Sequence, residues 1–396
     1  MLSATAISYE LDDSEAAARE LAASIKEKLS LKKNSLGILF CDADCDGAAL
    51  SAELEKLLGI TVGGMTTLAE LENSGCLDGA LVLIVLTADD CFFSPAVSTS
   101  LIGNNYEEKM VAAYEASAHG VSGFGEKPAF IFAFCPSGMS FSGDKYPDVL
   151  SKAAPNVPII GGVSSDDYDY KRARVFLSGK AYLDSLVLIS VWGRAKPIFS
   201  LRHVTSRFAE RIRRVVRAEG NKVFTVGDET FVKYLEGFGL KTNVPDILLA
   251  FNSYPMMLTR EGGDEIPLMR HISALDPKDG SGTFLGDVPA GSLANICLVS
   301  KKDVMAACRE SMEALLEETQ KQGDYQYSTI FCISCCGRAM ILGSDSDAEG
   351  QILSELLPKN LNLAGAYCLG EICPARYKDG EAANRFHNCS ITFCAI

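Results

Sequence analysis

The sequence predicts a mixed α/β (α+β) fold made of two domains, each with mixed β-sheets flanked by helices. Three observations support this prediction. The chain has 396 residues, of which 47% are hydrophobic and 22% charged, so it can build more than one core. Apolar runs of strand length alternate with amphipathic helical segments. The order strand, loop, helix, strand recurs three times as a degenerate repeat, with spacings too irregular for a solenoid.

The first cycle begins with an amphipathic helix over Ser14–Leu31, whose apolar residues recur at helical spacing. A short apolar strand over Leu36–Phe40 follows it, and then a helix over Ala48–Leu58. The uninterrupted apolar run Ala80–Thr87 is typical of a strand that is buried on both faces.

The second and third cycles repeat this order. The second contains a loop rich in serine and glycine, Pro136–Gly143, and the regular elements expected around it are Ala129–Cys135 (strand), Asp148–Ala154 (helix), Val157–Ile160 (strand) and Leu183–Trp192 (strand). The elements expected in the third are Thr329–Ser334 (strand), Ala348–Leu357 (helix), Leu361–Leu369 (strand) and Cys389–Ile396 (strand).

A domain boundary is expected between the second and third cycles, giving domains at 1–225 and 226–396. Near it, the basic segment Arg207–Arg217 is expected to form a helix with a solvated face. Asp246–Phe251 is expected to begin a new strand. Lys302–Gln320 carries the strongest helical pattern in the chain.

Charge and composition exclude several classes of partner. The formal net charge is −14, and an acidic surface repels phosphate groups, so we expect no nucleic-acid partner and no binding to anionic membranes. No apolar run approaches the roughly 20 residues needed to cross a bilayer, and no secretory leader is visible. With 14 cysteines and no export signal, the chain is expected to be cytoplasmic, with reduced thiols.

An aspartate-rich segment raises the alternative of calcium binding. Asp42, Asp44, Asp46 and Glu53 satisfy the spacing of an EF-hand loop. Such a loop needs a helix on both sides, whereas a strand is expected before this one. We therefore favour a strand-to-helix turn in which Asp44 or Asp46 caps the helix. The cysteines of the last third leave a zinc or iron–sulfur site open, but most lie in strand-like runs, which favours core packing.

Polar residues near the C-terminus stand at the ends of apolar runs. Arg338 and Glu371 are expected either to pair with each other or to flank a pocket. In a pocket, the arginine would take a carboxylate and the glutamate an ammonium group, as an amino acid requires. Cys336 is expected to have a pKa lowered by Arg338, which leaves open an enzyme or redox sensor that uses this thiol. No nucleophile elbow or phosphate-binding loop is present, so an enzyme is not expected.

These segments resemble the FIST family, in its N-terminal and C-terminal domains, over nearly the whole chain. The resemblance rests on Cys335-Cys336-Gly337-Arg338, Tyr367-Cys368-Leu369-Gly370-Glu371-Ile372, His387-Asn388-Cys389-Ser390 and Pro158-Ile159-Ile160-Gly161-Gly162. It implies a stand-alone bacterial sensory module that binds a small ligand, with amino acids proposed. It also implies signalling through a partner such as a histidine kinase, a cyclic-dinucleotide enzyme or a chemoreceptor. One branch of the family binds haem and senses nitric oxide, which makes haem the alternative to having no cofactor.

The resemblance and the strand ends together predict a ligand cleft. The residues expected to edge it are Gly161, Gly162, Ser165, Asp166, Cys336, Arg338, Tyr367, Gly370, Glu371, His387 and Asn388.

Overall fold

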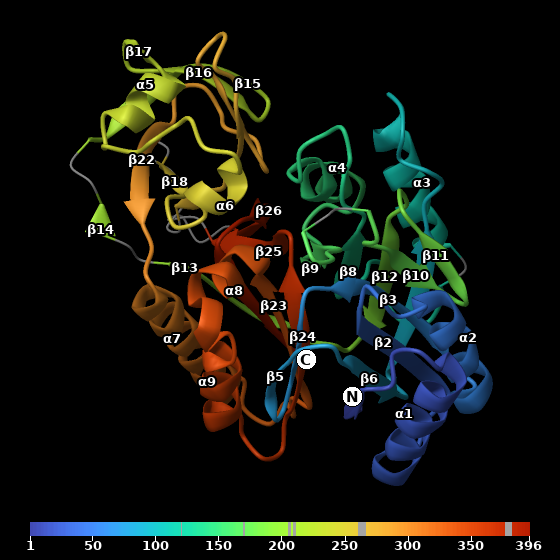
Figure 1. The fold of residues 1–396 in the computed structure, drawn as a ribbon. Coiled ribbons are helices and arrows are strands. Elements are labelled where there is room, and N and C mark those ends of the chain that lie inside the picture. Colours follow the sequence, from blue (N-terminus) through green and yellow to red (C-terminus); the bar gives the residue numbers. More distant parts are fainter. Residues whose placement is uncertain (120, 169–170, 205–206, 209–210, 260–266, 377–381) are drawn as a thin grey trace.

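The chain folds into three structural repeats and one inserted unit (Figure 1). The computed structural model describes residues 1–396 except 120, 169–170, 205–206, 209–210, 260–266 and 377–381. Repeat 1 spans residues 2–88 and repeat 2 spans residues 91–193. Repeat 3 consists of residues 198–203 and 301–395, and the insert, residues 207–298, interrupts it.

Repeats 1 and 2 have the same order of elements, which is strand, helix, strand, helix and then four strands. The elements of repeat 1 are β1 (Leu2–Ser8), α1 (Ser14–Lys28), β2 (Asn34–Asp42), α2 (Gly47–Leu58), β3 (Thr61–Thr67), β4 (Glu70–Glu72), β5 (Gly75–Leu77) and β6 (Leu81–Ala88). Those of repeat 2 are β7 (Cys91–Val97), α3 (Tyr106–Ala118), β8 (Phe130–Cys135), α4 (Lys145–Ala153), β9 (Ile159–Val163), β10 (Val175–Leu177), β11 (Lys180–Tyr182) and β12 (Val187–Gly193).

Repeat 3 keeps this order, with the insert after its first strand and its second helix divided. Its elements are β13 (Ile198–His203), α7 (Lys301–Gln320), β23 (Thr329–Cys335), α8 (Cys336–Leu342), η1 (Gly343–Asp345), α9 (Ala348–Leu356), β24 (Asn362–Cys368), β25 (Glu371–Arg376), β26 (Ala382–His387) and β27 (Ser390–Ala395).

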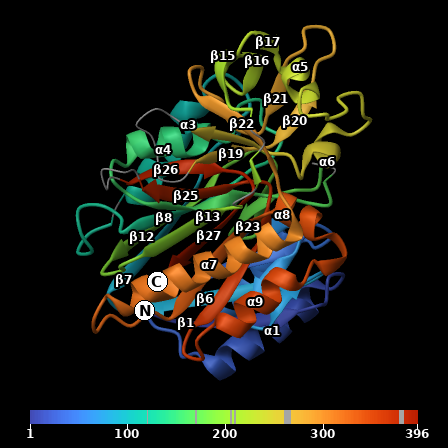
Figure 2. The same cartoon turned by 90° about the vertical axis from the view of Figure 1, so that its left-hand side faces the viewer.

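The insert forms a separate, nine-stranded antiparallel sheet with two short helices. Its elements are β14 (Arg207–Phe208), β15 (Arg213–Glu219), β16 (Lys222–Val226), β17 (Glu229–Thr230), α5 (Phe231–Glu236), α6 (Ile247–Phe251), β18 (Met256–Thr259), β19 (Leu268–Arg270), β20 (Ile272–Leu275), β21 (Gly282–Phe284) and β22 (Leu293–Leu298). It lies at one end of the molecule, above α7 and α9 in Figure 2.

The three repeats exchange hairpins in a closed cycle. Each repeat builds a sheet from four of its own strands, and its central pair is parallel: β2 with β3, β8 with β9, and β23 with β24. The remaining two strands of each sheet come from another repeat. Hairpin β10–β11 of repeat 2 completes the sheet of repeat 1, β25–β26 of repeat 3 that of repeat 2, and β4–β5 of repeat 1 that of repeat 3.

One glycine occupies the same place in each central strand pair. A Cβ atom added to Gly64, Gly161 and Gly365 would lie 1.8, 1.9 and 1.8 Å, respectively, from a carbonyl oxygen of the neighbouring strand. These oxygens belong to the residues paired with the three glycines, Leu39, Ala133 and Cys332. The shared glycine shows that the three repeats superimpose in register as well as in order.

A common apolar core lies between the three sheets. It contains Phe40, Phe132 and Phe331, and the rings of the last two are 4.7 Å apart between centroids. Helices cover the outer faces, as α7 does in Figure 2. Local signals place these helices: Ser300 and Asp303 form a capping box at the start of α7, and Asp46 caps α2 by accepting from Ala48 N and Ala49 N.

The predicted mixed α/β class and the degenerate repeats are confirmed. Two element predictions were wrong. The segment expected to be helical, Arg207–Arg217, contains strand β14 and the first part of β15, and its residues 209–210 lie outside the described part of the chain. The segment expected to begin a strand, Asp246–Phe251, holds helix α6. The boundary expected between residues 225 and 226 falls inside β16, and the division into two domains stays a prediction. Among the described residues, none of the helices combines the length and hydropathy that a transmembrane span needs.

Candidate functional site

The predicted ligand residues meet where repeat 3 donates its hairpin to repeat 2. Glu371 at the start of β25 lies opposite Gly162 of β9 on one side and opposite His387 of β26 on the other. Val163 N donates to Gly370 O at 3.0 Å, and Leu369 N donates to Val163 O at 3.1 Å. The end of β9 in repeat 2 and the start of β25 in repeat 3 therefore lie side by side.

These residues lie in the interior of the molecule. All eleven are buried: Gly161, Gly162, Ser165, Asp166, Cys336, Arg338, Tyr367, Gly370, Glu371, His387 and Asn388. That these residues edge a ligand cleft stays a prediction. The residues form the inner wall of the junction between repeats 2 and 3.

Arg338 is paired, but with a residue that the sequence did not indicate. Its Nη2 donates to Glu349 Oε1 at 2.5 Å and to Val304 O at 3.0 Å. Tyr367 OH donates to the other carboxylate oxygen of Glu349 at 2.9 Å. The alternative that Arg338 pairs with Glu371 is therefore wrong. The sequence signal that was missed is Glu349, a glutamate on the inward face of α9. A buried charge rarely lacks a partner, so this residue indicates that an oppositely charged side chain lies nearby.

Glu371 is held in an environment that favours its neutral form. Its Oε2 accepts from Ser390 Oγ at 2.5 Å, while Oε1 has no partner among the described residues. Burial raises the pKa of this carboxyl to about 8, against hydrogen bonds from Ser390 and Cys335 and the charge of Arg338, which lower it. Near neutral pH, Glu371 therefore carries a proton and is able to donate a hydrogen bond.

Cys336 does not have the lowered pKa that its neighbour Arg338 was expected to cause. Burial raises the pKa of the thiol, and a hydrogen bond with Ser165 only partly offsets this. The guanidinium of Arg338 pairs with Glu349, and burial is the largest influence on the pKa of the Cys336 thiol. The expectation of an activated thiol at Cys336 is wrong for this arrangement.

His387 and Asn388 keep polar atoms without partners in the interior. His387 Nε2 lies 3.1 Å from Cys373 O, and Asn388 Nδ2 donates to His387 O at 3.0 Å. His387 Nδ1 and Asn388 Oδ1 have no partner among the described residues. Burial lowers the pKa of His387 to about 3, so its imidazole is neutral. Unpaired buried polar atoms are costly, so these two atoms are open to a further hydrogen-bond partner.

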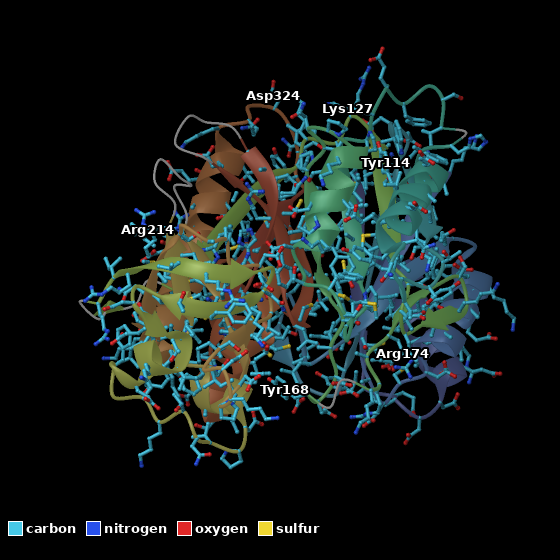
Figure 3. The ribbon with its side chains drawn as sticks, turned by 90° about the horizontal axis from the view of Figure 1, so that it is seen from above. Tyr114, Lys127, Tyr168, Arg174, Arg214 and Asp324 are labelled. Atoms are coloured by element: carbon cyan, nitrogen blue, oxygen red, sulfur yellow. The ribbon has the colours of Figure 1, made fainter. Side chains whose placement is uncertain are left out.

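Ser165 and Asp166 hold the turn that leaves β9. Ser165 Oγ donates to Tyr367 O at 3.1 Å, and Asp166 Oδ2 accepts from the backbone N–H groups of Lys171, Arg172 and Ala173. Tyr168, in the same turn, reaches repeat 3 and donates to Cys336 O at 3.3 Å. Figure 3 shows Tyr168 at the junction between the parts of the molecule, with Arg174 on the side of repeat 1.

A small cavity adjoins this wall. It has a volume of about 210 Å³ and is open on one side, and its lining is mostly apolar: Pro136, Ser137, Gly138, Met139, Phe141, Gly143, Tyr146, Val163, Leu285, Leu369 and Phe386. Val163 and Leu369 are the neighbours of Gly162 and Gly370, which joins the cavity to the predicted residues. The sequence indicated the glycine- and serine-rich loop but missed Leu285 and Phe386, since distant segments supply them.

Three parts of the chain are tied together beside this cavity by Arg270. Its Nη2 donates to both carboxylate oxygens of Asp144 in repeat 2, at 2.8 and 3.1 Å. Its Nη1 donates to Phe386 O in repeat 3 at 3.0 Å, and its Nε to Asp287 O in the insert at 3.0 Å. Asp287 N donates in turn to Asp144 Oδ2 at 2.7 Å. We call these residues the Arg270 junction.

The candidate calcium ligands lie elsewhere, in and after the turn that precedes α2. Asp42 accepts from Asp44 N at 2.7 Å and Asp46 caps α2, so both carboxylates serve the turn before α2. A strand precedes this turn, which does not fit an EF-hand with Asp42, Asp44, Asp46 and Glu53 as ligands. Among the described residues, no group of three or more histidine, cysteine, aspartate or glutamate side chains is placed to hold a metal.

None of the four histidines lines the 210 Å³ cavity, and haem as a cofactor stays an alternative prediction. His119 is exposed at the end of α3, and the ring centroids of His203 and His387 are 5.2 Å apart in the interior. His271 packs against Gly337, where a Cβ atom would lie 2.2 Å from the ring. A haem needs an axial ligand that faces a cavity, and none of these histidines is among the lining residues of the 210 Å³ cavity.

Comparison with known proteins identifies both halves of the chain. Residues 35–229 match the FIST N domain and residues 229–374 match the FIST C domain. A search of curated proteins finds no match.

Among solved structures, a cyanuric acid hydrolase is similar at a TM-score of 0.31 and 8% identity, covering 76% of this chain and all of that one. PurLQS from Thermotoga maritima is similar at a TM-score of 0.21 and 10% identity, covering 99% of this chain and 72% of that one. These likenesses are too weak to bear on function.

Proposed function

Because this chain belongs to the FIST family, with both its N and C domains, we propose that it senses a small ligand in the cavity beside Gly162 and Gly370 and signals through a partner protein. FIST domains are sensory, signal-transduction domains to which small-ligand binding is ascribed. One observation carries the proposal. The cavity lies where repeat 2, the donated hairpin of repeat 3 and the insert all contribute to one wall.

The ligand that this cavity suits is an amino acid or related metabolite with an apolar or aromatic side group. Phe141, Tyr146 and Phe386 supply aromatic surface, and a volume of about 210 Å³ admits only a small molecule. The polar contacts are expected from Ser137 and the backbone of Gly138, which belong to the lining. Recognition of a zwitterion directly by Arg338 and Glu371 receives no support, since Arg338 is paired with Glu349.

A ligand bound in this cavity would contact both the insert and repeat 2, so its binding can change how these two parts are positioned. Leu285 in the insert and Gly143 in repeat 2 line the cavity, and Gly143 N donates to Leu285 O at 3.3 Å. The Arg270 junction lies on the same segments. A ligand that fits one position of the insert better than another shifts the population of that position, which is how a sensor passes on occupancy.

The setting that suits this role is the cytoplasm, with signalling through a separate protein. All fourteen cysteines are free, as expected in a reducing compartment. Histidine kinases, cyclic-dinucleotide enzymes and chemoreceptors are the classes of partner that the family resemblance implies. We propose a binding module rather than an enzyme, since burial holds the best-placed thiol, Cys336, in its protonated form.

Thermal-shift screening of the full chain against amino acids and related metabolites tests the proposal. A ligand present at 100 times its dissociation constant raises the free energy of unfolding by about 2.7 kcal/mol. We expect apolar and aromatic amino acids or their derivatives to give the largest shifts. The variant Met139→Trp, which fills the cavity from its partly exposed edge, is expected to lose the response.

The matched control is Met305→Trp, a partly buried methionine on α7 that does not line the cavity. It should respond like the unmodified chain. If no compound in the panel stabilises the protein, or if Met139→Trp and Met305→Trp respond equally, the cavity is not the ligand site.

A further inference from the structure

Two cysteines lie together at the end of β2, far from the cavity described above. Cys41 is the next-to-last residue of β2, and Cys45 lies in the turn before α2. Both side chains belong to the same packed apolar cluster, and each thiol is the largest influence on the pKa of the other. Cys45 N donates to Asp42 O at 3.2 Å, so the chain folds back tightly between the two thiols.

The thiol pair is closely packed beside the start of α2, and one of its two members lines a cavity. The first residue of α2 is Gly47, and a Cβ atom there would lie 3.5 Å from Cys41 Sγ and 2.8 Å from the Phe176 ring. Cys45 lines a cavity of about 240 Å³, together with Thr66, Arg172 and Arg174 among others. Cys41 is fully buried behind Cys45, so a reagent that enters the cavity meets Cys45 first.

Its neighbour Cys41 distinguishes Cys45 from the other thiols. The Cys41 thiol lowers the pKa of Cys45, against burial and the charges of Asp46 and Asp42, which raise it. Burial instead raises the pKa of Cys76 to about 12 and also raises that of Cys91. A thiol of lowered pKa beside a second thiol is the usual arrangement of an attacking and a resolving cysteine.

We propose that Cys41 and Cys45 form a redox-responsive dithiol, which converts to a disulfide by exchange with a small disulfide such as oxidised glutathione. The Cys45 thiolate attacks one sulfur of the small disulfide, forming a mixed disulfide and releasing one thiolate. Cys41 then gives its proton to water, and its sulfur attacks the Cys45 sulfur, releasing the second thiolate. The two cysteines lose two hydrogens in total, and one small disulfide becomes two thiols.

This dithiol is independent of the proposed ligand sensing, because it lies in repeat 1 and shares no lining residue with the 210 Å³ cavity. Oxidation would act on the turn whose Asp46 caps α2. It would also act on Asp44, which is paired with Arg172 of the neighbouring repeat.

The test is peptide mapping by mass spectrometry after the folded full chain has been incubated with graded ratios of reduced to oxidised glutathione. Free thiols are trapped with an alkylating reagent before digestion. We expect a Cys41–Cys45 disulfide at ratios at which Cys76 is still alkylated. Cys76 is a stringent control, since it is more exposed than Cys45 but lacks a thiol of lowered pKa.

Two variants separate the roles of the thiols. Cys41→Ser is expected to trap glutathione on Cys45, and Cys45→Ser to leave Cys41 unmodified. If Cys76 is modified while Cys41 and Cys45 remain reduced in the unmodified chain, the proposal is overturned. The same holds if the disulfide forms only in urea, where the fold is lost. Both of these outcomes are measured on the unmodified chain, so they do not require that a variant folds.

Discussion

Arg338 and Glu349 form an ion pair with no exposed side-chain surface on either partner. Removing one partner of such a pair leaves an uncompensated buried charge, which costs about 3–5 kcal/mol. Glu349→Gln is therefore expected to lower the free energy of unfolding by about that amount. Urea denaturation measures the change.

The surface pair Arg309–Glu355 is the matched control, because it too has its glutamate on α9, here paired with an arginine of α7, but its side chains are 39% and 65% exposed. Glu355→Gln is expected to cost less than about 1 kcal/mol. Equal losses in the two variants would contradict the view that Arg338 is a structural charge. Such a result would mean that the pairing with Glu349 contributes little, so that the Arg338 guanidinium would be available to bind a ligand.

Glu371 makes a separate prediction about pH. In the unfolded chain its carboxyl loses its proton near 4.5, whereas burial raises its pKa in the folded chain to about 8. Between these values the folded state binds more protons, so this group lowers stability as pH rises from about 4.5 to about 8. The buried His271 acts on the acid side, since burial lowers its pKa to about 4 and stability is lost as pH falls from about 6.5 toward that value.

The variant Glu371→Gln isolates the first effect. It keeps an acceptor for Ser390 Oγ but has no proton to lose, so the difference in unfolding free energy between variant and unmodified chain should grow from pH 5 to pH 8 in the variant's favour. With 1.36 kcal/mol per pKa unit, the change across this window amounts to a few kcal/mol. Parallel stability curves for the two proteins would show that Glu371 is ionised in the folded state.

At the residue level, the sequence indicated which polar side chains gather at the junction but not how they pair. Arg338, Glu371 and His387 were recognisable because each stands at the end of an apolar run. The partner of Arg338 was not, because Glu349 lies eleven residues away in a helix whose rotation about its axis the sequence leaves open. Burial then reversed the expected effect on the pKa of Cys336.

At the scale of elements, signals confined to one segment were sufficient for the regular ones. The apolar stripe predicted α7 almost to the residue, and Asp46 was among the expected caps of α2. The errors fell on short pieces. The run Ile247–Phe251 holds five apolar residues in succession, and periodicity cannot distinguish a buried helical turn from a strand over that length. In β15, a bulge beside Arg217 interrupts the alternation that marks a strand.

The glycine shared by the repeats provides the prediction at this scale. In Gly64→Ala, Gly161→Ala and Gly365→Ala, the new methyl group would overlap a backbone carbonyl oxygen, which cannot move without parting two central strands. Each variant is expected to lose at least the about 1–3 kcal/mol typical of overpacking, and the three losses should be similar. Thermal and urea denaturation of the three variants measure this.

Gly47→Ala is the comparison, because its added methyl group meets a side chain, the Phe176 ring at 2.8 Å, rather than a backbone oxygen of a paired strand. It should cost less than the other three. A small loss in one repeat and large losses in the other two would mean that the repeats differ at their centres despite their common order.

At the scale of the whole molecule, the arrangement depends on pairings that no local pattern carries. The three cycles were visible as repeats, but the exchange of hairpins joins segments such as β4 and β24, which lie about 290 residues apart. The insert was visible only as a region rich in turns, since nothing in its sequence says that it interrupts a repeat. The cavity is missed for the same reason: Gly143, Leu285 and Phe386 come together only in three dimensions.

The Arg270 junction makes the prediction that belongs to this scale. The variant Arg270→Lys keeps the charge but loses the planar fork that reaches Asp144, Phe386 O and Asp287 O together. We expect the insert to separate from repeats 2 and 3 more often. Hydrogen exchange should then become faster at Asp287, whose N–H donates to Asp144, and at Gly143, whose N–H donates to Leu285 O.

The control is Lys145→Ala, which removes the partly exposed Lys145–Asp287 pair on the same segments and should leave exchange nearly unchanged. Exchange at Val85, in the buried strand β6 of repeat 1, should stay slow in both variants, because that strand is far from the insert. Uniformly faster exchange throughout the chain would mean that Arg270 supports global stability. A change confined to the segments around the cavity would mean that the insert opens as a unit, as a sensor that transmits occupancy through it requires.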